Sequence, residues 1–177
     1  MTYEVVISGF GGQGVMIIGQ LLAYAGMLEG KKVSFMPSYG PEMRGGTANC
    51  AVIISDEVIG NPLVSTPQVL VAMNNPSIEK FEPMMASNGV VLTNTSIVDR
   101  LQTRADVKFF GVAANDIAAD LKNAKTANIV MLGALLKIVP LIKPESLILA
   151  FEKKFVAKPE VIGINKKAFE CGAAAVK

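Results

Sequence analysis

Short apolar runs bounded by glycine, proline or polar residues recur through the first two thirds of the chain. Such runs predict buried strands. Segments with helical spacing of apolar residues lie between several of them. The expected strands are residues 3–8, 32–36, 47–55, 68–73, 89–93 and 108–112, and the expected helices here are 15–28, 77–85 and 115–121. Strands that alternate with helices indicate an α/β fold with a largely parallel sheet.

Strand signals end near residue 125, and the last third of the chain reads as helical. Residues 126–139 are apolar nearly all round, which is typical of a buried helix, and further helices are expected at 144–155 and from 159 onward. We expect residues 58–60 to pair antiparallel with 47–55, which would make the sheet mixed. The predicted fold is therefore a three-layer α/β/α, Rossmann-like domain over 1–177, with a mostly parallel, partly mixed central sheet and a helical C-terminal third.

Local signals refine this picture. Asn75 is the expected N-cap of its helix, with Pro76 at the first helical position. Cys50 is expected to be a small buried apolar residue. Small residues recur along the helix at 15–28 and just past its end, and they predict close packing: Gly19, Ala23, Gly26 and Gly30. Gly30 also predicts that the helix stops there.

A glycine loop, Gly9-Phe10-Gly11-Gly12-Gln13-Gly14, joins the first strand to the first helix. This arrangement aims backbone N–H groups and a helix N-terminus at an anion. The spacing also fits the dinucleotide pattern G-x-G-x-x-G. The alternative interpretation is structural, because close packing of the first strand against the first helix would also need glycines. A dinucleotide fold places an acid near the end of the second strand. That strand ends without one, and Glu29 lies at the helix end, so the sequence argues against NAD or FAD.

A second loop runs from Pro37 to Thr47 and contains two prolines, three glycines and the pair Glu42 and Arg44. Loops at strand ends of α/β sheets often carry function. The alternative interpretation is a rigid turn with a surface ion pair, and local sequence alone leaves both open.

The composition is apolar for a free-standing domain. Hydrophobic residues make up 51% and charged residues 18%, against a usual charged share of about 25%. The longest apolar stretch, 129–142, contains Lys137 and Pro140 and is shorter than the ~20 residues that a membrane span needs. With no signal-peptide pattern at the start, we expect a cytoplasmic subunit of a complex, not a membrane protein.

The residue inventory excludes several kinds of chemistry. The chain has no histidine, which excludes histidine-based triads and metal sites. Its two cysteines, Cys50 and Cys171, are far apart, so it cannot build an iron–sulfur cluster or a zinc site alone. The net charge is +2 without a basic run or tryptophan, so nucleic-acid binding is not indicated. Groups for redox or acyl chemistry would lie on a cofactor or a partner chain.

The two loops, G-F-G-G-Q-G-V and Y-G-P-E-M-R-G-G-T-A-N-C, together resemble one family. The chain is similar over its whole length to the gamma subunit of 2-oxoacid:ferredoxin oxidoreductases. The form Pro41-Glu42-Met43-Arg44-Gly45-Gly46 resembles the 2-oxoglutarate and branched-chain 2-oxoacid members more than the pyruvate members.

This resemblance implies a holoenzyme that converts a 2-oxoacid and coenzyme A into an acyl-CoA and CO2 and reduces ferredoxin. Thiamine diphosphate, Mg²⁺ and iron–sulfur clusters would be held mainly by alpha, beta and ferredoxin-like delta subunits. This chain would hold no redox centre and have no catalytic residue or metal ligand of its own. The runner-up functions are a nucleotide-binding scaffold and an NAD(P)-dependent oxidoreductase domain.

Two roles follow for the loops, and we expect a mixture of them at the carboxyl ends of adjacent strands. One is contact with coenzyme A, whose phosphates suit backbone N–H groups and arginine. The other is docking against the thiamine-binding subunits. The expected coenzyme A contacts are Gly11, Gly12, Gln13, Gly14 and Arg44. The expected docking residues are Tyr39, Gly40, Pro41, Glu42, Met43, Gly45 and Gly46.

Overall fold

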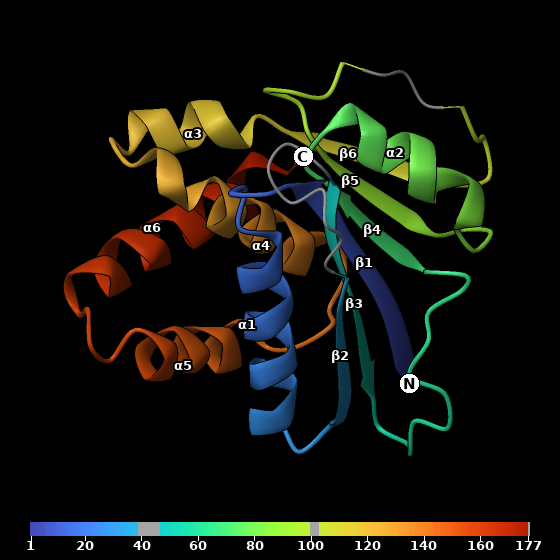
Figure 1. The fold of residues 1–177 in the computed structure, drawn as a ribbon. Helices are drawn as coiled ribbons and strands as arrows, with labels where there is room; N and C mark the ends of the chain where they lie inside the picture. Colours follow the sequence, from blue (N-terminus) through green and yellow to red (C-terminus); the bar gives the residue numbers. More distant parts are fainter. Residues whose placement is uncertain (39–46, 100–102, 177) are drawn as a thin grey trace.

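A computed structural model describes residues 1–38, 47–99 and 103–176 of the chain (Figure 1). The strands are β1 (Thr2–Phe10), β2 (Lys32–Ser38), β3 (Thr47–Ser55), β4 (Val69–Ala72), β5 (Val90–Asn94) and β6 (Lys108–Val112). The α-helices are α1 (Val15–Leu28), α2 (Asn75–Phe81), α3 (Ala114–Asp120), α4 (Ala127–Ile138), α5 (Pro144–Lys154) and α6 (Glu160–Ala175). Two short 3₁₀ turns are η1 (Glu82–Met84) and η2 (Ala124–Thr126).

The described strands form one sheet in the order β2-β3-β1-β4-β5-β6. β1, β4, β5 and β6 run parallel, whereas β3 is antiparallel to both of its neighbours, β1 and β2. The predicted mostly parallel, partly mixed sheet is therefore confirmed. The predicted partner strand at 58–60 is wrong, because both edges of β3 are already occupied and these residues form no strand.

The helices are distributed unequally over the two faces of the sheet. The larger apolar core lies between one face and α1, α3, α4, α5 and α6, which Figure 1 shows on one side of the sheet. A smaller core lies under α2 on the other face. This confirms the three layers and the helical C-terminal third. In the described part of the chain, no helix is both long and apolar enough to cross a membrane.

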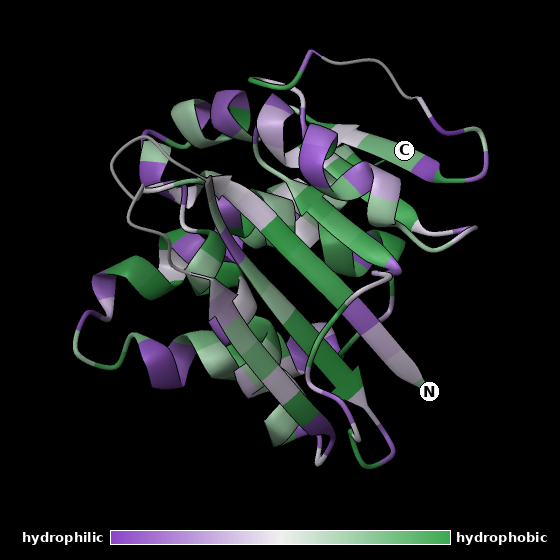
Figure 2. Cartoon of the chain, turned by 45° about the vertical axis from the view of Figure 1, so that its right-hand side comes forward, coloured by the Kyte–Doolittle hydropathy of each residue, from purple (hydrophilic) through white to green (hydrophobic). Residues whose placement is uncertain are grey.

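One part of the second sheet face is left open. α2 packs on β1 and β4, and Figure 2 shows the β2–β3 half of this face without a helix in front of it. The paired residues Met36 and Ala51 point to this face, as does Ser34. Met36 is 42% exposed, and Ser34 and Ala51 are half-buried. We call these three residues the open sheet face.

The ends of two helices follow local hydrogen-bonding rules. Asn74, not Asn75, caps α2: its Oδ1 accepts from the N–H of Ser77 at 3.0 Å. The predicted cap is therefore wrong by one residue, and Pro76 lies one position further into the helix. At the end of α1, Gly30 has φ +74 and its N–H donates to Met27 O. The N–H of Lys31 donates to Gly26 O, which completes the Schellman stop.

Cys50 lies in the core between β3 and α1 and is fully buried. Its Sγ lies 3.5 Å from Val15 O, and burial raises the pKa of its thiol to about 12. A Cβ on Gly19 would lie 2.6 Å from this sulfur, so the glycine allows the helix to approach the sheet. The predicted roles of Cys50 as a small buried residue and of Gly19 in close packing are confirmed.

The closest helix contact joins α4 to α6. A Cβ on Gly133 would lie 2.0 Å from Phe169 O, and a Cβ on Gly172 would lie 1.9 Å from Val130 O. Both distances are far below any real contact, and both neighbours are backbone atoms. The two helices can therefore touch only through glycine at these positions.

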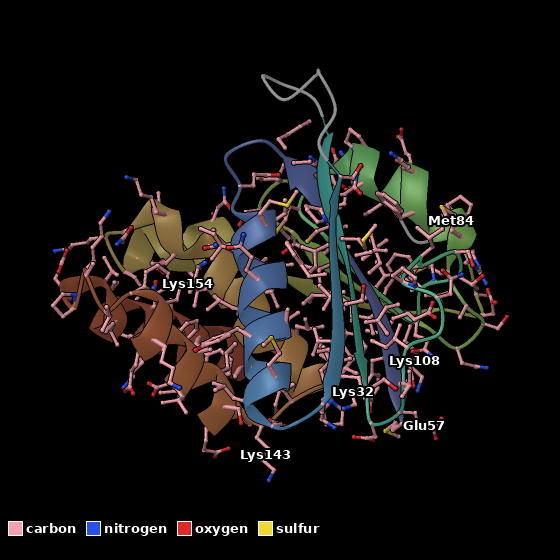
Figure 3. All side chains as sticks on the ribbon, turned by 60° about the horizontal axis from the view of Figure 1, so that its bottom comes forward. Lys32, Glu57, Met84, Lys108, Lys143 and Lys154 are labelled. Atoms are coloured by element: carbon pink, nitrogen blue, oxygen red, sulfur yellow. The ribbon has the colours of Figure 1, made fainter. Side chains whose placement is uncertain are left out.

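Charged side chains gather at the amino-end edge of the sheet, opposite the glycine loop. Figure 3 shows Lys32, Glu57 and Lys143 at this end of the molecule. Asp56 lies here too, 2.7 Å from Lys31 Nζ and 2.8 Å from the N-terminal nitrogen. These two cations, with the Lys31 hydrogen bond as the larger cause, lower the pKa of Asp56 to about 2. The amino-end edge of the sheet thus carries ion pairs.

Candidate functional site

The glycine loop leaves the carboxyl end of β1 and turns directly into α1. Gly12 and Gly14 have φ +97 and +77, values that L-residues with a side chain adopt at a cost. Gly14 is the N-cap of α1, and no side chain caps this N-terminus. The first turn of α1 also contains no acidic residue. The helix itself therefore supplies no carboxylate at the positive end of its dipole.

Gln13 holds the loop in shape. Its Oε1 accepts from Phe10 N at 2.6 Å, and its Nε2 donates to Met73 O at 3.3 Å. A Cβ on Gly9 would lie 2.5 Å from the same Oε1. The side chain therefore connects the ends of β1 and β4, and the glycine makes room for it.

Several backbone N–H groups of the loop have no hydrogen-bond acceptor. Within the ranges that the structure describes, the N–H groups of Gly12, Gly14 and Val15 have no acceptor. A loop of glycines followed by a free helix N-terminus is the usual geometry of an anion site. The loop is thus prepared for an anionic group.

Asn128, near the start of α4, lies against this loop. Its Nδ2 donates to Gly14 O at 3.3 Å, and a Cβ on Gly14 would lie 2.4 Å from the same nitrogen. The residue is only 4% exposed, yet its Oδ1 has no partner among the described residues. A buried unpaired carbonyl costs about 1–3 kcal/mol, so this oxygen is a candidate acceptor for a bound ligand. Asn74 Nδ2 is the second such buried atom.

The glycine loop and Asn128 line a pocket of about 350 Å³, which we call the glycine-loop pocket. Of the predicted residues, Gly12, Gln13 and Gly14 line it and Gly11 does not. Asn115, Lys125 and Asn128 also line it. Lys125 is exposed and places a positive charge beside the loop.

A second pocket of about 350 Å³, which we call the α6 pocket, adjoins the first and shares Ile17, Lys125 and Asn128 with it. Its remaining walls combine apolar side chains, among them Ile129, Phe155 and Ile164, with polar ones that include Lys158 and Asn165. Together the two pockets place a candidate anion-binding subsite beside one of mixed polarity.

The second predicted loop lies outside the described residues. Tyr39, Gly40, Pro41, Glu42, Met43, Arg44, Gly45 and Gly46 all fall in the undescribed range 39–46. The flanking residues show where it starts and ends. Ser38 ends β2 and Thr47 begins β3, and Thr47 pairs with Phe10 at the end of β1.

The two loops therefore leave the same edge of the sheet. However, β1 and β2 are not adjacent, because β3 lies between them. The expected adjacency of these strands is wrong. In a dinucleotide-binding fold, the acidic residue that binds the ribose lies at the end of the strand beside β1. In this chain β3 occupies that position. Glu29, the only acid near the expected offset, accepts from Lys143 N at 2.6 Å and anchors α5 instead.

The residues that sequence reasoning missed are Asn115, Lys125 and Asn128. Asn128 gave the clearest signal, because it is a polar residue near the start of a helix that is otherwise apolar on nearly every side. In the described ranges, no group of three or more histidine, cysteine, aspartate or glutamate side chains could hold a metal ion.

Comparisons with known proteins agree on one family. The model of the family "Pyruvate ferredoxin/flavodoxin oxidoreductase" matches residues 4–175. Ketoisovalerate oxidoreductase subunit VorA of Methanothermobacter marburgensis is 41% identical over 171 residues, which are 96% of this chain and 36% of that protein. This chain thus spans about a third of that relative's length.

Two further relatives match most of their own length. 2-Oxoglutarate synthase subunit KorC of Methanocaldococcus jannaschii is 37% identical over 151 residues, covering 83% of this chain and 80% of that one. The crystal structure of the keto/oxoacid ferredoxin oxidoreductase gamma subunit from Geobacter sulfurreducens superposes with a TM-score of 0.85 at 28% identity. It covers 98% of this chain and 97% of that one. The resemblance noted from the two loops is confirmed.

Proposed function

Because this chain belongs to the pyruvate ferredoxin/flavodoxin oxidoreductase family, we propose that it is the gamma-type subunit of a 2-oxoacid:ferredoxin oxidoreductase. The observation that carries the proposal is the family match across residues 4–175, together with relatives named for ketoisovalerate and 2-oxoglutarate. The substrate would be 2-oxoglutarate or a branched-chain 2-oxoacid. The complex would release CO2, transfer the acyl group to coenzyme A and pass two electrons to ferredoxin.

The chain's own residues leave the redox chemistry to its partners. Cys50 is fully buried with a raised pKa, and Cys171 is its only companion. Two separated thiols cannot supply the four ligands of an iron–sulfur cluster. Thiamine diphosphate, Mg²⁺ and the clusters would be held by alpha, beta and ferredoxin-like delta subunits, in a cytoplasmic complex without nucleic-acid or membrane partners. This chain would enter it as a single domain, 1–177.

Assembly is the first role that we propose. Three observations favour it: an apolar composition, the open sheet face, and relatives in which the equivalent segment is part of a longer chain. Residues 39–46 connect the two strands that carry the open sheet face. We propose that a partner subunit covers this face and contacts Tyr39, Gly40, Pro41, Glu42, Met43, Gly45 and Gly46.

Contact with coenzyme A is the second role. The loop N–H groups without acceptors, the uncapped helix N-terminus and the cationic Lys125 fit the phosphates of coenzyme A. We propose that Gly11, Gly12, Gln13, Gly14 and Arg44 contribute to its binding. When bound, coenzyme A supplies the thiol that accepts the acyl group. The glycine loop would bind and orient the anionic part of the molecule.

Replacing Arg44 by alanine in a reconstituted complex is expected to raise the KM for coenzyme A about tenfold if the guanidinium contacts a phosphate, since a charge-assisted hydrogen bond contributes about 1.5 kcal/mol. Loss of co-purification would instead support the docking role of this loop. The matched control is Lys32→Ala, which removes a positive charge at the amino-end edge of the sheet. If Arg44→Ala behaves like this control in both assays, neither role of Arg44 stands.

A further inference from the structure

A hollow of about 310 Å³ lies between α1 and α5. Four side chains line it: Gln20 and Tyr24 on α1, and Lys153 and Lys154 in the last turn of α5. The two helices pack against each other and lie side by side in Figure 1. None of these four residues lines the glycine-loop pocket or the α6 pocket. We call this feature the α1–α5 hollow, and the proposed function does not use it.

The polar groups of the α1–α5 hollow are mainly hydrogen-bond donors. Lys154 Nζ donates to Gln20 Oε1 at 2.7 Å, which engages the acceptor of that amide. Among the residues that the structure describes, Gln20 Nε2, Tyr24 Oη and Lys153 Nζ make no hydrogen bond or ion pair. A group that accepts several hydrogen bonds, such as a carboxylate, would therefore complete this set.

The hollow also carries two positive charges and no carboxylate in its lining. Lys153 and Lys154 are both exposed. The preceding residue, Glu152, has its Oε1 2.7 Å from Lys166 Nζ, so this acid pairs with α6 instead. Lysines in the last turn of a helix favour the helix dipole, which accounts for their charge but not for the hollow beside them. This surface is complementary in charge to an acidic partner.

An apolar stripe continues the hollow along α1. Met16, Gln20, Tyr24 and Met27 share one side of the helix, because they are three or four residues apart. Met27 is 61% exposed and the other three are half-buried, and Figure 1 shows no described helix in front of α1. We call these four residues the α1 stripe. An occupant that covers both the stripe and the hollow must combine apolar side chains with carboxylates, as a segment of a protein chain does and a small inorganic anion does not.

We propose that the α1 stripe and the α1–α5 hollow form a second assembly surface, which takes an acidic, amphipathic segment of a partner subunit. The apolar side chains of this segment cover Met16, Tyr24 and Met27, and its aspartates or glutamates pair with Lys153 and Lys154. α1 lies on the opposite face of the sheet from the open sheet face, so partners hold the chain from both sides. The inference rests on the proposed function, because it needs a partner subunit.

Cross-linking of the assembled complex with a carbodiimide tests this surface, because the reagent joins an amine only to a carboxylate in contact with it. Peptides that link Lys153 or Lys154 to an aspartate or glutamate of another subunit are the expected products. The ion pair between Lys166 and Glu152, at 2.7 Å, is the internal positive control. If this pair is linked and neither lysine of the hollow joins another subunit, the inference fails. Links to a second copy of this chain would overturn it too, as would loss of the links when coenzyme A is added to an intact complex.

Lys153→Glu combined with Lys154→Glu is expected to weaken assembly about tenfold or more in a reconstituted complex, because it turns attraction into repulsion. The melting temperature of the chain should change little, since both side chains are exposed. Rising NaCl should weaken assembly of the wild-type chain and affect the double variant much less. The matched control replaces Lys137 and Lys143, two exposed lysines that do not line the hollow, by glutamate, and it should assemble normally.

Failure of this surface and failure of the proposed function give different results. If the Lys153→Glu and Lys154→Glu double variant forms an active, coenzyme A-dependent complex as readily as the control, the proposed function stands and the second assembly surface falls. If no subunit of a 2-oxoacid oxidoreductase assembles with the wild-type chain, the proposed function fails and the surface falls with it.

Discussion

Replacing Gly172 by alanine is expected to cost the chain about 3 kcal/mol of folding free energy or more, or to prevent folding, because overpacking of this kind is among the most damaging core changes. The added Cβ would lie 1.9 Å from Val130 O and 2.7 Å from its carbonyl carbon. These are backbone atoms of α4, so no side-chain rotation can relieve the contact. Gly133→Ala should act similarly, against Phe169 O at 2.0 Å.

The measurement is thermal and urea unfolding of purified variants, with an expected fall in melting temperature of about 10 °C for Gly172→Ala. Gly163→Ala is the matched control, since Gly163 lies in the same helix and nothing lies within 4 Å of its Cβ position. Alanine favours helix over glycine by about 0.8–1 kcal/mol, so this control should be neutral or stabilising. Equal stability of the two variants would contradict the described contact between α4 and α6.

Replacing Gly14 by alanine is expected to have the largest effect on the site, with a loss of about 2–4 kcal/mol in stability and at least tenfold weaker binding of coenzyme A. The substitution imposes φ +77 on a residue with a side chain. It also places a Cβ 2.4 Å from Asn128 Nδ2 and 2.8 Å from its Cγ. Asparagine is too short to move aside while it keeps its bond to Gly14 O, so both loop and Asn128 must shift.

Gly30→Ala separates backbone strain from the contact with Asn128. Gly30 has a nearly equal φ of +74, has nothing within 4 Å of its Cβ position, and ends α1 away from the loop. It should lose only roughly 1–2 kcal/mol of folding free energy and bind coenzyme A normally. The comparison uses urea unfolding and calorimetric titration on the same samples. If Gly14→Ala matched Gly30→Ala in both measurements, the contact between Gly14 and Asn128 would contribute neither to stability nor to ligand binding.

The sequence predicted the elements of the fold well, because their signals are local. The periodicity of residues 15–28 and 126–139 identified α1 and the buried α4, and the small residues of α1 indicated its close approach to β3. The error at 58–60 has a non-local cause: Val58 and Ile59 favour a strand, but β3 already has partners on both edges. Asn74 and Asn75 are chemically identical candidates, and only backbone geometry selects Asn74.

Only part of the site could be predicted, because only part of it is contiguous in sequence. The glycine loop is contiguous in sequence, so its spacing was visible. Asn128 meets Gly14 across 114 residues, and no local pattern connects them. The insertion of β3 between β1 and β2 depends on strand order, which the apolar runs do not specify. Lys125 resembles any other surface lysine until the fold brings it beside the loop.

The most direct test of the central claim is to tag this chain in its native source and purify it under mild, oxygen-free conditions. Larger, brown, cluster-bearing chains are expected to co-purify with it in fixed proportion. The purified complex should reduce ferredoxin with a 2-oxoacid only when coenzyme A is present. A chain that purifies alone as a stable monomer or homodimer, without associated 2-oxoacid oxidation, would contradict its role as a subunit of such a complex.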